Sequence, residues 1–529
     1  MNNERITIYQ ALPRLFGNRN PHPIPNGSIA ENGCGKLSAF TGKVLKEIQK
    51  MGFNHIWYTG LLEHATQTDY SDFGIRKDHP AIVKGKAGSP YAVKDYYNID
   101  PDLAEDVPNR MSEFEALVKR THRAGLKVLI DFVPNHVARE YHSEAKPAGI
   151  EDLGASDNKQ TTFAPDNNFY YIPGQTFELD TYREFPAKAT GNDCFSAHPG
   201  RNDWYETVKL NYGIDYLNGG KTHFSPTPST WKKMRDILLF WAGKGIDGFR
   251  CDMAEMVPVE FWAWAIPQIK QKYPAILFIA EVYNPHQYRN YLHNGKFDYL
   301  YDKVGLYDAL RGVIIGWQPA SNITQCWQAV SDIQSQMLNF LENHDEQRIA
   351  SDFFAGNPAK ALPALVVSAT MNTNPFMVYF GQEVGERGMD TEGFSGCDGR
   401  TSIFDYWSIP SFRGELSSAQ KELRNYYIKV LQLCNQSKAI REGKFYDLMY
   451  VNPRSEHFNP GKQFAYLRGH EEELLLIVAN FDEKDVEVNV FLPAHAFDYF
   501  GIKASPARDS YVQLHIKAHD AAIFLIPDS

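Results

Sequence analysis

The sequence predicts an α/β fold: a (β/α)8 TIM barrel with an inserted subdomain after strand 3 and a C-terminal antiparallel β domain. Three observations predict it. Short apolar runs alternate with amphipathic helical segments eight times. One long stretch between the third and fourth runs lacks this alternation. After Cys434 the pattern changes to short β-type runs separated by turn residues, which is typical of an antiparallel domain.

The eight apolar runs are the predicted barrel strands. The run 126–133 (LKVLIDFV) is almost unbroken, as expected of a parallel strand that is buried on both faces. The segment between each run and the next is long enough for the crossover connection that parallel strands require. The predicted strands are Ile6–Gln10, Phe53–Tyr58, Leu126–Val133, Ile246–Cys251, Ile276–Val282, Phe297–Tyr301, Met337–Leu341 and Phe376–Phe380.

Helical periodicity fills several of the intervals between these strands. In the segment 112–125, Phe114, Leu117 and Val118 fall on one face, and Gly125 stands where a helix ends. The predicted helices are Phe40–Met51, Ser112–Gly125, Thr230–Gly243 and Pro258–Lys272.

The segment from His136 to about Ser229 interrupts the alternation. It is rich in Asn, Asp, Gly, Pro and Tyr, and a structureless loop of this size is unusual in a compact domain. We therefore expect barrel segments at 1–136 and 229–434, an inserted subdomain at 137–228 and a β domain at 435–529. The strands expected in that last domain are Gln463–Leu467, Leu474–Val478, Val486–Phe491, Tyr511–Ile516 and Ala521–Ile526.

Composition narrows the function classes. The chain has 54 Lys plus Arg against 64 Asp plus Glu, a formal net charge of −10, which argues against nucleic acid as the main partner. The six cysteines show no Cys-x-x-Cys spacing, so zinc chemistry has no support. The chain shows neither a basic-then-apolar leader nor an apolar run of membrane-spanning length, so we expect a cytoplasmic protein with no membrane partner.

Polar residues gather where the predicted strands end. In a barrel of this type the carboxyl ends of the strands face the active site. Asp131, Asn135 and His136 follow the third strand, and Arg250 and Asp252 follow the fourth. Glu281 follows the fifth strand, and His344 and Asp345 follow the seventh.

Two of these carboxylates have the placement that glycoside hydrolysis needs. Asp252 and Glu281 are 29 positions apart, about one βα unit, so they should stand on adjacent strands. Retaining glycosidases use two carboxyl groups about 5–5.5 Å apart. Arg250 lies on the same side of its strand as Asp252 and should keep that group ionised, whereas the apolar neighbours of Glu281 should raise its pKa. Asp345 would stabilise positive charge on the sugar.

Four motifs in this order resemble the conserved regions of the α-amylase family, the family 13 glycoside hydrolases. They are DFVPNH (131–136), GFRCDMAEMV (248–257), FIAEVYN (278–284) and FLENHD (340–345). The resemblance implies that Asp252 is the nucleophile, Glu281 the general acid/base and Asp345 the transition-state stabiliser. It also implies that the sugar is bound by Tyr91, Asp131, His136, Arg250 and His344.

A structural calcium ion is a further expectation of this resemblance. Asn135 matches a position that often ligates calcium between barrel and insert, and TVKLNY (207–212) is similar to a fifth conserved region, where Asn211 replaces a frequent carboxylate. Glu255 and Met256 stand where many α-amylases carry Lys-His, so substrate detail cannot be transferred.

Three functions remain open from the sequence. The first is a retaining hydrolase of α-1,4-glucosidic bonds in starch, glycogen or maltooligosaccharides. The second is a 4-α-glucanotransferase, in which a sugar instead of water accepts the covalent intermediate. The third is a catalytically inactive glucan-binding barrel. Taken alone, Arg250 and Asp252 are also compatible with a purely structural buried ion pair. The presence of all three carboxylates favours an enzyme over the inactive barrel. Oligomeric state is not encoded in any recognisable pattern.

Overall fold

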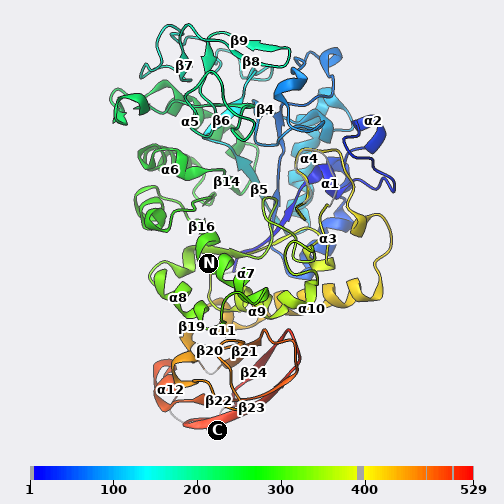
Figure 1. The fold of residues 1–529 in the computed structure, drawn as a ribbon, viewed down its shortest axis with the longest axis vertical. Helices are drawn as coiled ribbons and strands as arrows, with labels where there is room; N and C mark the ends of the chain where they lie inside the picture. The colour runs from blue at the N-terminus through cyan, green and yellow to red at the C-terminus, as the bar shows by residue number, and fades with distance from the viewer. Residues whose placement is uncertain (1–4, 390–397, 472, 503–504, 528–529) are drawn as a thin grey trace.

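A computed structural model describes residues 5–389, 398–471, 473–502 and 505–527. Eight parallel strands close into a barrel, which confirms the predicted fold class (Figure 1). Their order follows the chain, and the last strand pairs with the first through Thr7 and Phe376. The barrel strands are β1 (Thr7–Ala11), β2 (His55–Tyr58), β5 (Lys127–Phe132), β14 (Gly248–Cys251), β15 (Leu277–Ala280), β16 (Tyr299–Tyr301), β17 (Met337–Phe340) and β18 (Phe376–Tyr379).

Alternation along these strands builds two separate cores. Ile8, Trp57 and Leu129 point into the barrel and pack with Ile279 and Met377. Their neighbours in sequence point outward and belong to the larger core between barrel and helices. The strands are therefore apolar on both faces because successive side chains alternate between two buried surfaces.

The predicted helices are present, with ends that shift by up to two residues. Thr41 caps α3 by accepting a hydrogen bond from the backbone N–H of Val44, and Leu45 and Ile48 lie on its buried face. The longer helices of the barrel region are α3 (Gly42–Met51), α4 (Arg110–Arg123), α5 (Ser229–Ala242), α6 (Val259–Lys272), α7 (Asp308–Ile314), α8 (Asn322–Ala329), α9 (Leu362–Thr370) and α10 (Ser418–Gln436).

Two excursions rise above the barrel at the top of Figure 1. The first, which was not predicted, is the antiparallel pair β3 (Leu62–His64) and β4 (Val93–Ile99) after strand β2. The second is the insertion, which leaves through β6 (His136–Ala138) and returns through β11 (Thr207–Lys209), paired with it. Its other strands are short: β7 (Tyr171–Ile172), β8 (Phe177–Leu179), β9 (Tyr182–Glu184), β10 (Ala187–Lys188), β12 (Ile214–Asp215) and β13 (Lys221–Thr222).

The C-terminal region folds as antiparallel strands at the opposite end of the molecule (Figure 1). All five strands predicted there are present, and β19 (Lys444–Asp447) and the helix α12 (Ala494–Phe500) were missed. The sheet order is β19–β20–β21–β24, beside the pair β22–β23. These strands are β20 (Gln463–His470), β21 (Glu473–Asn480), β22 (Val486–Leu492), β23 (Ser510–Ile516) and β24 (Asp520–Leu525).

Candidate active site

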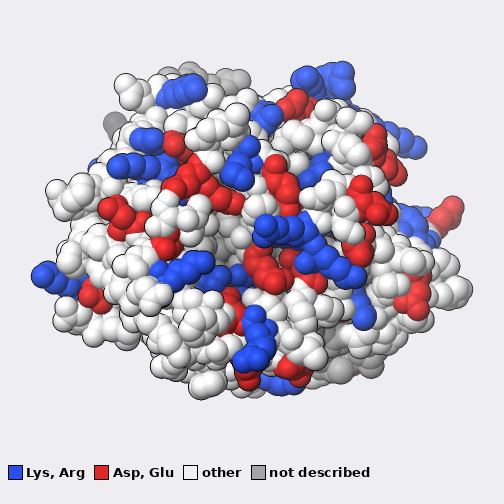
Figure 2. Space-filling model, turned by 90° about the horizontal axis from the view of Figure 1, so that it is seen from above, with Lys and Arg blue, Asp and Glu red and all other residues white. Residues whose placement is uncertain are grey.

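A pocket of about 510 Å³ opens at the carboxyl ends of the barrel strands, beneath the insertion. Asp252, Glu281 and Asp345 all line it, together with Tyr91 and His136. Figure 2 shows this end of the molecule from above, with acidic and basic side chains interspersed over it. Residues that are remote in sequence thus meet in one pocket, because parallel strands in a barrel all end at the same rim.

Arg250 organises the floor of this pocket. Its Nη1 lies 2.7 Å from Asp252 Oδ1, and its Nη2 lies 2.9 Å from Glu281 Oε2. Strands β14 and β15 pair in register at Cys251 and Ala280, so Asp252 and Glu281 each come one residue after the last paired position. One buried guanidinium therefore holds both carboxylates and sets the spacing between them.

The surroundings of Arg250 explain why it cannot turn away. Its Nη1 also lies 3.7 Å from Asp131 Oδ1, and its Nε donates to the Tyr301 hydroxyl at 3.2 Å. The rings of Trp57, Tyr91 and Tyr301 surround the guanidinium, with centroids 5.2–5.5 Å from its central carbon. Aromatic faces favour a nearby cation, so the charge is stabilised although the residue is only 1% exposed.

Glu281 is positioned by two further donors. The backbone N–H of Met253 donates to Glu281 Oε2 at 2.8 Å, and the Tyr283 hydroxyl donates to Oε1. Met253 has a φ of 42°, a left-handed conformation that a residue with a side chain seldom adopts. This turn, directly after Asp252, brings its N–H to the carboxylate. Tyr283 was not among the predicted site residues, because a tyrosine after a strand carries no distinctive pattern.

His344 and Tyr91 form the opposite side of the site. Their rings stack with centroids 5.2 Å apart, and the Tyr91 hydroxyl lies 2.6 Å from His344 Nε2. Gln10 Nε2 donates to His344 Nδ1 at 2.9 Å, so the ring proton is placed on Nε2, which lies 3.1 Å from Asp345 Oδ2. Gln10, on the first strand, was not predicted as a site residue, since nothing in its local sequence separates it from a core position.

Burial changes the protonation of these groups. It raises the pKa of Asp252 well above its usual range, the Glu281 carboxylate adds to that effect, and Arg250 opposes it. This balance runs against the expectation that Arg250 keeps Asp252 ionised, because desolvation outweighs the guanidinium. Enclosure and the Glu281 carboxylate raise the pKa of Asp345 to about 7, and burial raises that of Asp131 to about 6. Burial keeps His344 neutral by lowering its pKa.

The predicted calcium ligands are occupied by other donors. Lys209 Nζ donates to Asn135 Oδ1 at 2.8 Å and forms an ion pair with Asp193. Asn211 Oδ1 accepts the backbone N–H of Gly213 at 2.8 Å. The donor set does not fit a calcium ion at Asn135 and Asn211, because a lysine ammonium, itself buried, already supplies positive charge there.

His136 faces the catalytic pocket beside this lysine. Burial, and to a smaller extent Lys209, lower the pKa of His136 to about 3, so its ring is a neutral hydrogen-bonding group. Asn135 Nδ2 lies 3.1 Å from His136 Nδ1 and orients the ring. Trp204 packs against the ring at 5.2 Å between centroids and also lines the pocket.

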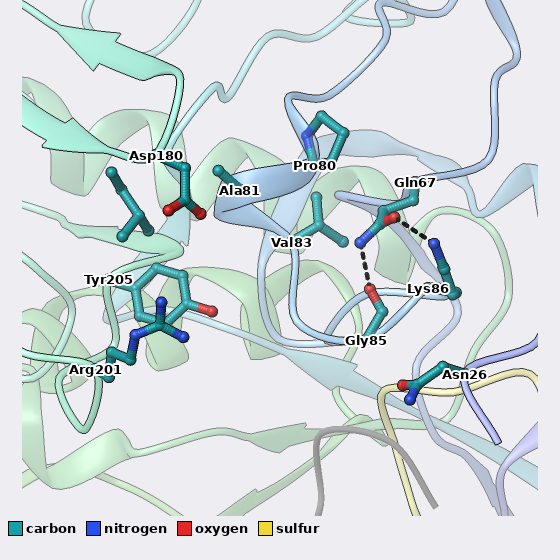
Figure 3. A pocket seen from close by; sticks show the side chains of 11 residues that line it. Asn26, Gln67, Pro80, Ala81, Val83, Gly85, Lys86, Asp180, Arg201 and Tyr205 are labelled. Atoms are coloured by element: carbon teal, nitrogen blue, oxygen red, sulfur yellow. Dashed lines mark hydrogen bonds between the residues drawn. The ribbon is translucent and has the colours of Figure 1, made fainter.

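A second hollow of about 490 Å³ adjoins the pocket between the insertion and the loop 65–87 (Figure 3). Successive residues face different hollows: Val83, Gly85 and Tyr205 line the second one, whereas Lys84 and Glu206 line the catalytic pocket. Lys84 Nζ and Glu206 Oε1 are 2.9 Å apart, so this ion pair lies between the two hollows.

The protein is a (β/α)8 barrel in which one arginine holds two carboxylates and a third carboxylate lines the same pocket. This arrangement is that of the glycosidases that use a pair of acidic residues. The family model "Alpha amylase, catalytic domain" matches residues 10–422. The chain therefore belongs to the α-amylase family, the family 13 glycoside hydrolases, and is a glycosidase.

The relatives share a low sequence identity with this chain, but the matches extend over most of its length. Alpha-amylase 3 of Dictyoglomus thermophilum is 23% identical over 74% of this chain and 74% of its own length. A cyclomaltodextrinase of Bacillus sp. is 22% identical over 90% of this chain and 72% of its own length. For neopullulanase 2 of Thermoactinomyces vulgaris, at 23% identity, the match spans 73% of this chain and 57% of that protein.

Solved structures with the same fold cover almost the whole chain. The cyclic α-maltosyl-(1→6)-maltose hydrolase of Arthrobacter globiformis has a TM-score of 0.66 at 18% identity and covers 99% of both chains. A maltogenic α-amylase of Thermotoga neapolitana has a TM-score of 0.62 at 20% identity, with 99% and 97% coverage. Within the described residues, no helix has the length and apolar character needed to cross a membrane.

Proposed function

We propose that the protein is a retaining hydrolase of α-1,4-glucosidic bonds in starch, glycogen or maltooligosaccharides. The observation that carries this proposal is the guanidinium of Arg250, which holds Asp252 and Glu281 together in a pocket that Asp345 shares. Two carboxyl groups held this way can act on one sugar ring, one as nucleophile and one as proton donor.

In the first step Asp252 attacks the anomeric carbon through a carboxylate oxygen. The bond from that carbon to the glycosidic oxygen breaks, and Glu281 transfers its proton to the departing oxygen. Asp252 loses its negative charge as the ester forms, and Glu281 gains one. Because Arg250 contacts both groups, it stays next to a negative charge throughout this exchange.

In the second step water attacks the anomeric carbon of the ester. Glu281 accepts a proton from that water, and Asp252 leaves as a carboxylate, so the configuration at the anomeric carbon is retained. Met253 N–H and the Tyr283 hydroxyl hold Glu281 in place for both transfers. Asp345 and His136 line the pocket where sugar hydroxyls can bind, and Tyr91 offers an aromatic ring to the sugar face. His344 stacks on the Tyr91 ring and supports it from behind the pocket wall.

The names of the relatives support an α-glucan as substrate. They include α-amylase, cyclomaltodextrinase and neopullulanase. A cyclomaltodextrin glucanotransferase of Geobacillus stearothermophilus, 23% identical over 89% of this chain, favours the second candidate, a 4-α-glucanotransferase that uses the same intermediate.

Product analysis from pure maltoheptaose decides between these candidates. A hydrolase forms one new reducing end for each bond cleaved and only shorter products, with the α anomer formed first. If the products include chains longer than maltoheptaose and few new reducing ends form, the protein is a transferase and the hydrolase proposal is wrong. The absence of turnover by the folded protein on maltoheptaose, amylose and pullulan would leave the inactive glucan-binding barrel. The Asp252→Asn variant is the matched control, since it keeps the side-chain shape.

A further inference from the structure

A second acidic cluster lies outside the catalytic pocket. It consists of Glu63 on β3, Asp95 on β4 and Glu144 in the insertion, and each brings an acidic oxygen within 4.8 Å of the other two. Glu63 and Asp95 are cross-strand partners, and the register of the pair shifts on both sides of Glu63. This irregularity redirects side chains within the short β3–β4 pair. Glu63 and Asp95 are almost completely buried, whereas Glu144 lies at the solvent-exposed surface.

Hydrogen bonds hold these carboxylates but leave charge uncompensated. Asp95 accepts from the Tyr97 N–H at 2.7 Å, the Ser143 hydroxyl at 2.6 Å and the Ala145 N–H at 2.9 Å. Glu144 Oε1 accepts the Arg76 N–H at 3.1 Å. Among the described residues, Arg110 is the cationic side chain paired with the cluster, with Nη2 2.9 Å from Glu63 Oε2.

One buried oxygen of this cluster has no hydrogen-bond partner among the residues that the structure describes. Glu63 Oε2 is held by Arg110, whereas Glu63 Oε1 is enclosed and accepts no hydrogen bond. Three carboxylates against one guanidinium would leave a net charge of −2. Two of these like charges, on Glu63 and Asp95, are buried, which is unfavourable. Glu63 Oε1 is therefore the atom that a further positive charge would contact.

We propose that Glu63, Asp95 and Glu144 bind a calcium ion. Carboxylate oxygens are the ligands that Ca²⁺ prefers, at about 2.3–2.6 Å, so two oxygens on one ion lie at most about 5 Å apart. The 4.8 Å limit of this cluster agrees with that geometry. Calcium tolerates irregular coordination, which suits ligands supplied by three separate chain segments, whereas Mg²⁺ demands a near-octahedral arrangement.

Such an ion would fasten the β3–β4 pair to the insertion. Tyr91 lies two residues before β4, and Asp95 within β4 accepts hydrogen bonds from Ser143 and Ala145, on either side of Glu144. The ion would thereby hold the loop that carries Tyr91 against the insertion. Lys209 makes a comparable connection at Asn135 on the other edge of the insertion without a metal.

The competing account is a neutral Glu63. Burial and the neighbouring Asp95 carboxylate raise the pKa of Glu63 to about 8, so a proton could compensate the charge instead of a metal. The two accounts differ in their response to calcium and do not depend on the enzymatic activity.

The test uses the full-length protein, stripped with EDTA and dialysed into metal-free buffer at neutral pH. Melting curves and calorimetric titrations are recorded with CaCl₂ and, separately, MgCl₂, at about 1 mM. We expect calcium to bind with a stoichiometry of one and to raise the Tm by about 2–5 °C, and magnesium to act more weakly. Glu63→Gln and Glu144→Gln should remove both responses.

The matched control is Glu342→Gln. Glu342 is equally buried and pairs with one arginine, Arg348, at 2.8 Å, but it is not part of the cluster. This variant should keep the calcium response. No heat and no change in Tm for the wild-type protein would overturn the proposal in favour of the protonated Glu63. A calcium response that survives in both Glu63→Gln and Glu144→Gln would overturn it by placing the ion elsewhere.

Discussion

The catalytic pocket and the acidic cluster are built from the same ingredients, carboxylates around one arginine. Arg250 faces Asp252, Glu281 and Asp131 at 2.7, 2.9 and 3.7 Å, and the first two of these groups line a pocket of about 510 Å³. Among the described carboxylates, Glu63 is the one that pairs with Arg110, and the three carboxylates of its cluster face one another.

The difference shows how geometry assigns chemistry to the same residue types. Where carboxylates point into a cavity, their free oxygens can contact a substrate. Protons and one guanidinium then compensate the negative charge of the carboxylates. Where they converge on each other at coordination distance, their free oxygens can meet an ion.

Asp252→Asn should abolish most of the activity, whereas Asp95→Asn should not. Removing the nucleophile eliminates covalent catalysis, so we expect kcat to fall by about 10⁴-fold or more. The hydrogen-bond partners of Asp95 among the described residues are Tyr97, Ser143 and Ala145, and none of them lines the pocket. The kcat of Asp95→Asn should therefore stay within about tenfold of the wild type. Initial rates on maltoheptaose check both, with circular dichroism as the folding control. Equal losses in the two folded variants would refute the assignment of the nucleophile.

Arg250→Met and Arg110→Met should have different consequences for stability. Arg250→Met leaves buried carboxylates without their cation and should cost about 3–5 kcal/mol. Arg110→Met removes the one competing positive charge from the acidic cluster, so calcium should bind more tightly and its effect on Tm should grow. Urea unfolding with and without calcium measures both. A smaller calcium response in Arg110→Met would count against the ion.

Lys209→Met should destabilise the protein without creating a need for calcium. The ammonium donates to Asn135 and pairs with Asp193, and losing such charged hydrogen bonds costs about 1–3 kcal/mol. The loss should be the same in EDTA and in calcium, in contrast to variants of the acidic cluster. Calcium rescue of Lys209→Met would instead restore the predicted site at Asn135.

The pH profile should show protons balancing charge in the catalytic pocket. Asp345, whose pKa is raised to about 7, and Asp252, whose pKa is also raised, must be ionised to act. Lowering the pH protonates them, so kcat/KM should fall on an acidic limb that lies well above the usual aspartate range. EDTA should not move this limb. A rate that is flat down to pH 5 would contradict the prediction.

The Lys84→Ala substitution should have the smallest effect of these variants, and the effect should be on the length of the products. Removing the ion pair with Glu206 opens the boundary between the two hollows, so we expect product ratios from maltoheptaose to change about two- to fivefold. Total turnover should be preserved. Glu206→Gln is the matched variant, because it keeps the shape and removes the charge.

The predictable part of this protein lies in its local patterns. The eight barrel strands were each visible because the apolar runs are buried on two faces, and the strand-end motifs located Asp252, Glu281 and Asp345 because a barrel brings all strand ends to one rim. Gln10 and Tyr283 were missed, since their roles depend on partners across the barrel. The hydrogen bond from Lys209 to Asn135 was missed for the same reason, since these residues are 74 positions apart.

By itself, the sequence determined the barrel, the interruption after its third strand and the acidic residues at its rim, because periodicity and strand-end position are local properties. The tertiary structure decided which charges touch. Whether a carboxylate faces an arginine, a lysine, a cavity or another carboxylate depends on distances between segments far apart in the chain. The interaction energy between two charges decreases as the distance between them increases, and it becomes larger when water is excluded.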